Sequence, residues 1–271
     1  PSDAMMDRLA GLDAYREVFI TPTDAMVRAD SRSLLVVVDT NRPEQVLSQD
    51  LLDSINRVAV IDHHRRAASY IEGAALSFHE PHASSASELV TELLQYILEP
   101  GELLKEEAEA LLAGIVLDSK NFIHRTGSRT FDTAAFLRRA GADTMEVQNF
   151  FAGDLTSTIA MYDIMRRTQI YRDSMAIASV DHAVDRVTAA KAADSLLTIA
   201  GVDASFVLFP AEDGRIILSG RSQGKVNVQV ILEALGGGGN ATGAGAQVPD
   251  KTLDEVREDL IAAIDKYCET E

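Results

Sequence analysis

The densest group of chemically capable side chains in the sequence is Asp62-His63-His64-Arg65-Arg66, which begins where the apolar run 57–61 ends. Two imidazoles and a carboxylate suit a divalent transition metal such as Mn²⁺, Fe²⁺, Co²⁺ or Zn²⁺. The two arginines suit phosphate oxygens, which a guanidinium group can contact through two hydrogen bonds. Taken alone, the segment could also be a polar turn whose histidines are solvated.

A second aspartate, Asp39, follows the apolar run 33–38. Short, uninterrupted, β-branched runs of this kind are typical of parallel strands that are covered on both faces. Ligand sites in open α/β sheets lie at the carboxyl ends of the strands, so we expect Asp39 and Asp62 to lie side by side at one edge. This pairing favours a metal and phosphate site over a polar turn.

A third aspartate, Asp118, ends the apolar run 111–117. A carboxylate is unfavourable at the C-terminus of a helix, and a nearby metal ion would account for it. By itself Asp118 is equally well explained as a turn residue.

Glycines dominate a segment near the C-terminus. Gly236, Gly237, Gly238 and Gly239 precede Asn240, and Gly243 and Gly245 follow. Four positions without side chains let the backbone approach a ligand and present N–H groups to an anion, although a flexible loop is the commoner meaning of such a run. The later glycines favour a phosphate or nucleotide cradle. Arg221 and Ser222, at the end of the preceding predicted strand, could face the same site, or Arg221 could be an exposed edge residue.

Hydrophobic periodicity predicts an α/β protein with two domains. In the first part it predicts strands over 33–40 and 57–62, another ending near Phe78, and helices over 45–55, 88–98, 106–116 and 128–140. In the second part it predicts strands over 175–180, 204–209 and 215–222 and helices over 188–199, 227–235 and 253–267. We therefore expect a parallel-sheet domain over residues 1–144, a helical connector over 145–168 and a smaller α/β domain over 169–271.

Composition excludes several function classes. The chain has 271 residues with a net charge of −17, which argues against binding duplex nucleic acid through a broad basic surface. A single cysteine, Cys268, excludes a disulfide framework and a multi-thiolate zinc site. No apolar run reaches the length of a membrane span, so we expect this polypeptide to make no membrane contact and to be cytoplasmic. His79, His82, His124 and His182 show no ligand spacing and are interpreted as ordinary surface or core residues.

Four motifs occur in the order found in one protein family: Val37-Val38-Asp39, Asp62-His63-His64, the segment 114–118 and the glycine run with Asn240. Together they resemble the DHH phosphoesterases that carry a DHH-associated domain. The longer stretches 35–43, 60–66, 83–90, 118–127 and 227–230 resemble the GdpP-type cyclic-di-AMP phosphodiesterases within that family.

The resemblance implies a role for each motif residue. Asp39 would bridge two metal ions, and His63 and Asp118 would be ligands of the second ion. Asp62 would orient His63, and His64 would face the scissile phosphate. Arg221 and the backbone of the glycine run would hold the nucleotide from the second domain.

The activity implied by the resemblance is hydrolysis of cyclic-di-AMP to linear pApA. Two metal ions, Mn²⁺ or alternatively Co²⁺ or Mg²⁺, would hold a hydroxide that attacks phosphorus. One alternative is the same chemistry on short linear oligoribonucleotides or single strands. Another is a nucleotide-binding regulatory module without catalysis. A homodimer is compatible with each of these functions.

Two departures from the family pattern stand out. The family motif H-x-x-x-D-x-D is absent, because no histidine is followed by aspartate four positions later. The chain therefore looks like a fragment that begins after the first strand–helix unit, from a parent that the resemblance implies is anchored to the bacterial membrane. We expect the fragment alone to be inactive and to bind at most one Mn²⁺ tightly. Asn240 stands where the family often has histidine, and asparagine cannot titrate near neutral pH.

Overall fold

A computed structural model describes residues 9–15, 17–66 and 68–270, which form two compact units. The first unit ends at Ala152 and the second begins at Gly153. Residues 145–168, the expected connector, are mostly helical and are divided between the units. Helix α7 (Thr144–Asn149) belongs to the first unit and α8 (Leu155–Arg166) to the second. Each unit is described by itself below.

The first unit is built on a three-stranded parallel sheet in the order β1-β2-β3, which confirms the predicted parallel sheet. Its strands are β1 (Leu35–Val38), β2 (Val58–Asp62) and β3 (Leu76–His79). Every residue of the central strand β2 is buried, as the uninterrupted apolar run predicts. The register pairs Asp62 with His79, so the carboxyl ends of these two strands coincide.

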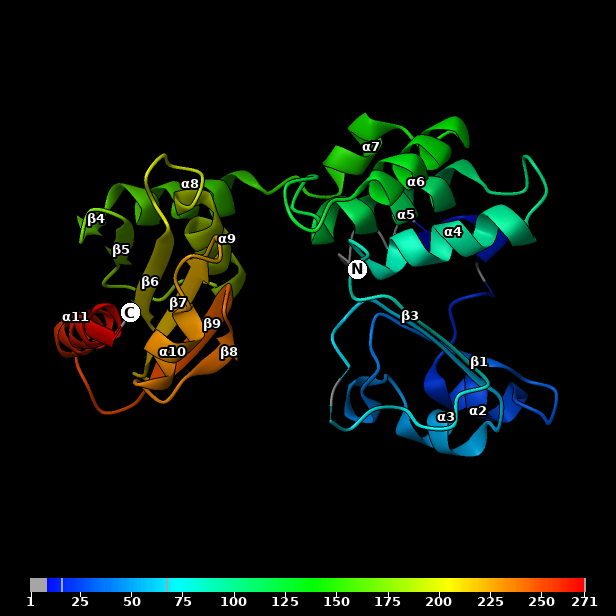
Figure 1. The fold of residues 1–271 in the computed structure, drawn as a ribbon, viewed down its shortest axis with the longest axis horizontal. Coiled ribbons are helices and arrows are strands. Elements are labelled where there is room, and N and C mark those ends of the chain that lie inside the picture. Colours follow the sequence, from blue (N-terminus) through cyan, green and yellow to red (C-terminus); the bar gives the residue numbers. More distant parts are fainter. Residues whose placement is uncertain (1–8, 16, 67, 271) are drawn as a thin grey trace. The chain divides into compact units, whose positions relative to one another are not determined.

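Helices pack on both faces of this sheet around β2 (Figure 1). Leu52 of α3 (Gln49–Ser54) packs on one face and Leu89 of α4 (Ala86–Ile97) on the other. The first unit also contains α2 (Pro22–Arg28), α5 (Lys105–Asp118), α6 (Ser128–Arg139) and the short 3₁₀ segments η1 (Asp13–Tyr15) and η2 (Pro43–Gln45). Helices α5, α6 and α7 share a separate apolar core around Ile115 and Leu137. The predicted helix over 45–55 is shorter in the structure: Gln45 ends η2, residues 46–48 are not helical, and α3 begins at Gln49.

Gly114 lies where α5 packs closely against α4. A Cβ atom there would overlap the hydroxyl of Ser87 and lie 2.9 Å from the Ser87 Cβ. We expect Gly114→Ala to lower the free energy of unfolding by about 1–2 kcal/mol, because overpacking outweighs the better helix propensity of alanine. Urea denaturation measures this. Adding Ser87→Gly should recover part of the loss, and a Gly114→Ala protein as stable as the wild type would contradict the close packing.

The second unit is a six-stranded mixed sheet in the order β4-β5-β6-β7-β9-β8. Its strands are β4 (Thr168–Tyr171), β5 (Met175–Ser179), β6 (Ala204–Pro210), β7 (Ile216–Ser222), β8 (Gly238–Asn240) and β9 (Gly243–Val248). Helices α8 and α9 (Arg186–Leu196) pack on one face, and α10 (Val228–Glu233) and α11 (Leu253–Thr270) pack on the other (Figure 1). The predicted smaller α/β domain is confirmed.

The glycine run is not the flexible loop that was the alternative to a ligand cradle. Gly238, Gly239 and Asn240 form the edge strand β8, which pairs antiparallel with β9. The Asn240 side-chain oxygen closes the hairpin, since it accepts hydrogen bonds from the backbone N–H groups of Thr242 (3.0 Å) and Gly243 (2.9 Å). Neither strand was predicted, because glycine and alanine carry no strand signal in the sequence.

No helix among the described residues is long and apolar enough to cross a membrane.

Candidate functional site

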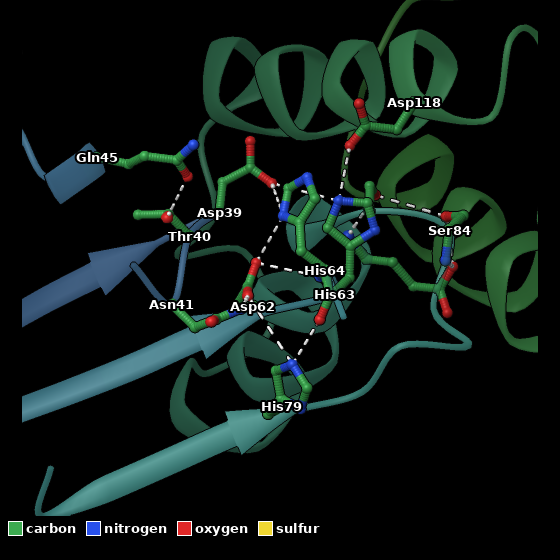
Figure 2. Close-up of polar contacts among 12 residues, drawn as sticks. Asp39, Thr40, Asn41, Gln45, Asp62, His63, His64, His79, Ser84 and Asp118 are labelled. Atoms are coloured by element: carbon green, nitrogen blue, oxygen red, sulfur yellow. Dashed lines mark hydrogen bonds and ion pairs between the residues drawn. The ribbon is translucent and has the colours of Figure 1, made fainter. Parts of the chain in front are cut away.

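The ends of the three parallel strands bring the predicted metal-binding residues together (Figure 2). Asp39 directly follows β1, and His63 and His64 directly follow β2. The backbone N–H of Asp39 still donates to the Ile61 carbonyl (3.0 Å), and its φ of +64° then turns the chain sharply out of the strand. Aspartate tolerates this left-handed conformation better than most residues. The expected pairing of Asp39 with the Asp62-His63-His64 segment at one sheet edge is confirmed.

His63 lies between two carboxylates. Its Nε2 atom is 3.3 Å from Asp39 Oδ1 and 3.5 Å from Oδ2 of Asp118, the last residue of α5. The His63 ring is only 5% exposed, so its orientation is fixed by packing. One ligand atom from each of Asp39, His63 and His64 can be chosen so that all three lie within 4.8 Å of one another. A carboxylate and two imidazoles that converge in this way fit a divalent cation, and Asp118 borders this cluster through His63.

The pKa values of these groups reflect their mutual attraction. Burial alone would lower the pKa of His63, but the hydrogen bond to Asp39 and the negative charge of Asp118 raise it above its ordinary value. Burial raises the pKa of the Asp118 carboxyl; His63 opposes this rise and the charge of Asp39 adds to it. In the metal-free protein a proton on His63 therefore sits where a cation would bind.

Metal affinity should consequently depend on pH. Because a cation must displace the His63 proton, we expect Mn²⁺ affinity to rise by up to about tenfold per pH unit below the His63 pKa and then to level off above that pKa, which is higher than the ordinary value for histidine. Calorimetry in buffers of different ionisation enthalpy measures the affinity and the released proton. His63→Gln should flatten the profile, and a pH-independent affinity in the wild-type chain would contradict this role of His63.

Asp62 organises the other histidine. It is fully buried, and its carboxylate accepts hydrogen bonds from Asn41 Nδ2 (2.5 Å), from the backbone N–H of His64 (3.2 Å) and from His64 Nδ1 (2.8 Å). Burial on its own would raise the pKa of Asp62, but these hydrogen bonds outweigh it and hold the pKa below its ordinary value. Asp62 therefore stays ionised and fixes the His64 ring.

The expectation that Asp62 orients His63 is therefore corrected: among the contacts of the described residues, it orients His64. The reason is the turn that follows β2. His64 lies at a bend, which brings both its backbone N–H and its ring to the Asp62 carboxylate, whereas His63 faces Asp39 and Asp118 (Figure 2).

The predicted nucleotide-binding residues of the second unit divide into two groups. Arg221 and the glycines 236–239 line one pocket of about 760 Å³. The Arg221 side chain donates to the Gly220 carbonyl (2.9 Å), and its Nε lies 3.6 Å from Asp194 Oδ2. Ser222 and Asn240 are not among the lining residues. Ser222 is buried and accepts from the Gly224 N–H (2.9 Å), and Asn240 holds the hairpin turn.

Comparison with known families agrees with this geometry. The model described as "DHH family, N-terminal domain" matches residues 2–115, and the model described as "DHHA1 domain" matches residues 172–270. The chain carries a DHH domain followed by a DHHA1 domain. The resemblance inferred from the motifs is confirmed, and the Asp39–His63–Asp118 cluster lies in the DHH half of the chain.

Two of the curated relatives of the chain are phosphodiesterases by name. The chain is 47% identical to the cyclic-di-AMP phosphodiesterase PdeA of Listeria monocytogenes, over 92% of this chain and 38% of that protein. It is 44% identical to the cyclic-di-AMP phosphodiesterase GdpP of Bacillus subtilis, over 97% of this chain and 41% of that protein. The chain thus spans about two fifths of the length of these relatives.

The fold of the chain is also found among solved structures. The crystal structure of an exopolyphosphatase-related protein from Bacteroides fragilis has a TM-score of 0.78 at 21% sequence identity, covering 94% of this chain and 76% of that one. This likeness supports the α/β fold alone.

Two residues of the DHH site were missed by sequence reasoning. Asn41 is buried and donates to Asp62, and His79 Nε2 donates to the His64 carbonyl (2.5 Å) and lies 3.9 Å from Asp62 Oδ2. A signal for His79 was present, because it ends the third predicted strand and parallel strand ends meet at one edge. His79 is therefore a positioning residue for the Asp62–His64 pair rather than an ordinary surface histidine.

Proposed function

We propose that the protein is a metal-dependent phosphodiesterase that hydrolyses cyclic-di-AMP to linear pApA. The observation that carries this proposal is the cluster of Asp39, His63 and His64 in the first unit, with Asp118 3.5 Å from the His63 Nε2 atom. The substrate assignment rests on the two relatives that are named cyclic-di-AMP phosphodiesterases.

Each residue of the DHH site has a distinct task in this proposal. Asp39, His63 and Asp118 hold a divalent cation, which when bound stabilises the negative charge that develops on the phosphate oxygens. Asp62 accepts the Nδ1 proton of His64 and so fixes the ring, which leaves Nε2 for contact with the scissile phosphate. Asn41 and His79 hold Asp62 and the His64 backbone in place.

The DHHA1 domain binds the nucleotide in this proposal. Arg221 contacts a phosphate through its guanidinium group, and the glycines of the β8–β9 hairpin let the backbone approach the ligand. A single local positive charge such as that of Arg221 can bind a phosphate although the chain has an overall charge of −17.

Mn²⁺ is the cation that we propose for the site, because carboxylate and imidazole ligands together suit it. Two ions would need more protein ligands than Asp39, His63 and Asp118, and the H-x-x-x-D-x-D motif is absent from the sequence. We therefore expect one tightly bound Mn²⁺ per chain, measured by elemental analysis and electron paramagnetic resonance. Two fully occupied ions bound by this chain alone would contradict the ligand assignment.

The proposed activity is tested by comparing binding with hydrolysis. The chain in Mn²⁺ should bind cyclic-di-AMP and form little pApA by chromatography, because it lacks the remaining ligands. Joining a family segment that carries H-x-x-x-D-x-D before residue 1 should restore hydrolysis. A joined protein that binds cyclic-di-AMP without hydrolysing it would instead support a nucleotide-binding regulatory module.

A further inference from the structure

The pocket of the DHHA1 domain continues well beyond Arg221. Alternate residues of β7 point to one face of the sheet, and Arg215, Ile217, Ser219 and Arg221 all line the pocket. Arg221 lies six positions after Arg215, so their backbones are about 20 Å apart along the extended chain. The pocket therefore has two ends, each with an arginine.

Helix α9 places a second arginine at the Arg215 end. Asp194 of α9 lies beside Arg221, with 3.6 Å between the Asp194 Oδ2 and Arg221 Nε atoms. Arg186 lies eight residues earlier, about 12 Å along the helix axis. Because Arg186 and Arg215 both line the pocket, they mark the end that lies away from Asp194.

The stretch between the two ends has few side chains. Gly243 and Gly245 of β9 line it, and Ala190 of α9 borders it. The Arg221 guanidinium extends over Gly243, with its Nη1 atom 3.7 Å from the position that a Cβ would take. The exposed Gln247, paired with Ile217 in the sheet, and the buried Ile217 and Phe209 also line the pocket, so a chain of sugars and bases would lie over the glycines and beside Gln247.

A phosphate can displace Asp213, the residue that pairs with Arg215 in the structure. Both arginines there are exposed, and Arg215 donates from Nε (2.8 Å) and Nη2 (2.5 Å) to one oxygen, Oδ2, of the exposed Asp213. Exposed pairs of this kind contribute little free energy, so a phosphodiester, which offers two oxygens to the guanidinium group, can replace Asp213.

Building on the proposed function, we propose that Arg186 and Arg215 form a second phosphate subsite for linear oligonucleotides. One phosphate of the ligand lies at Arg221 and the glycine hairpin, and a later phosphate of the same strand lies at Arg186 and Arg215. The two phosphates of a cyclic dinucleotide belong to one small ring and cannot span the pocket, whereas an extended strand can. The second subsite therefore selects for linear ligands longer than a mononucleotide.

The test measures dissociation constants of AMP, linear pApApA and cyclic-di-AMP by calorimetry in EDTA, so that nothing is hydrolysed. The readout is the ratio of the AMP constant to the pApApA constant. We expect Arg186→Ala and Arg215→Ala each to lower this ratio roughly tenfold, the loss of one charge-assisted contact. Lys191→Ala is the matched control, because it removes one positive charge from an exposed position of α9 outside the pocket.

The outcomes separate this subsite from the proposed function. A ratio unchanged by the arginine variants, an equal loss in Lys191→Ala, or a wild-type chain that does not bind pApApA would overturn the second subsite. A wild-type chain that binds pApApA through Arg215 but does not bind cyclic-di-AMP would support the subsite and count against the proposed substrate.

Discussion

Removing the Asp39 carboxylate should lower Mn²⁺ affinity by more than about 100-fold, since even residues that only orient metal ligands contribute 10–100-fold. Asp39 is the residue that approaches both histidines, with its Oδ1 atom 3.3 Å from His63 Nε2 and 3.9 Å from His64 Nδ1. Without it, His63 faces a single carboxylate, that of Asp118. Isothermal titration of the metal-free chain with MnCl₂ measures the effect. In the protein joined to a family segment that carries H-x-x-x-D-x-D, the same substitution should abolish hydrolysis of cyclic-di-AMP.

The choice of substitution matters at this position. Asp39 has a φ of +64°, which alanine adopts with strain and asparagine tolerates. Asp39→Asn therefore removes the charge while keeping the backbone, and thermal unfolding should confirm an intact fold. Asp132→Ala, on an exposed position of α6, removes the same charge elsewhere in the DHH domain and serves as the control. If Asp39→Asn bound Mn²⁺ as tightly as Asp132→Ala, Asp39 would not be a ligand.

The DHH half of the chain was predictable because its strands carry a strong signal. Val58 to Ile61 are apolar and buried without interruption, and a residue that ends such a strand is placed at the sheet edge by topology alone. The positions of Asp39 and His63 therefore followed from the sequence. Asp118 was expected beside them only through the family resemblance, because by itself it is equally well explained as a turn residue.

The detailed contacts within that edge were not predictable in the same way. Whether Asp62 orients His63 or His64 depends on how the backbone turns after β2, where the His64 N–H donates to the Asp62 carboxylate, and the motif letters do not state this. Asn41 and His79 reach Asp62 only because the strand register brings them there, with Asp62 opposite His79. A one-residue change of register would have exchanged these partners.

The β8–β9 hairpin could not be predicted from the sequence for a different reason. Its strands hold no aromatic residue and a single β-branched one, Val248, and the reason for glycine becomes visible only in the packing. A Cβ at Gly237 would lie 2.7 Å from the Ala246 Cβ, and one at Gly239 would lie 2.6 Å from the Ala244 Cα. These two glycines are required for β8 to approach β9, whatever ligand the hairpin binds.

Gly238 is the exception among these glycines, and it makes a sharp test of nucleotide binding. No atom lies within 4 Å of the position that its Cβ would take, and Gly238 lines the pocket beside Arg221. A valine there should leave the hairpin intact, because β-branched residues suit strands, and should occupy the space that the ligand needs. We expect Gly238→Val to weaken cyclic-di-AMP binding roughly 30-fold or more, which corresponds to about 2 kcal/mol.

Calorimetric titration of cyclic-di-AMP measures this loss, and Gly238→Ala should give an intermediate value because its methyl group fills less of the pocket. Unfolding by urea should be the same for both variants and the wild type, which separates a blocked pocket from a disrupted hairpin. Gly237→Val cannot distinguish a blocked pocket from a disrupted hairpin, since its side chain would overlap residues of β9. Unchanged affinity in Gly238→Val would mean that the glycines serve only the β8–β9 pairing, and Arg221 would then have to bind the nucleotide without the hairpin.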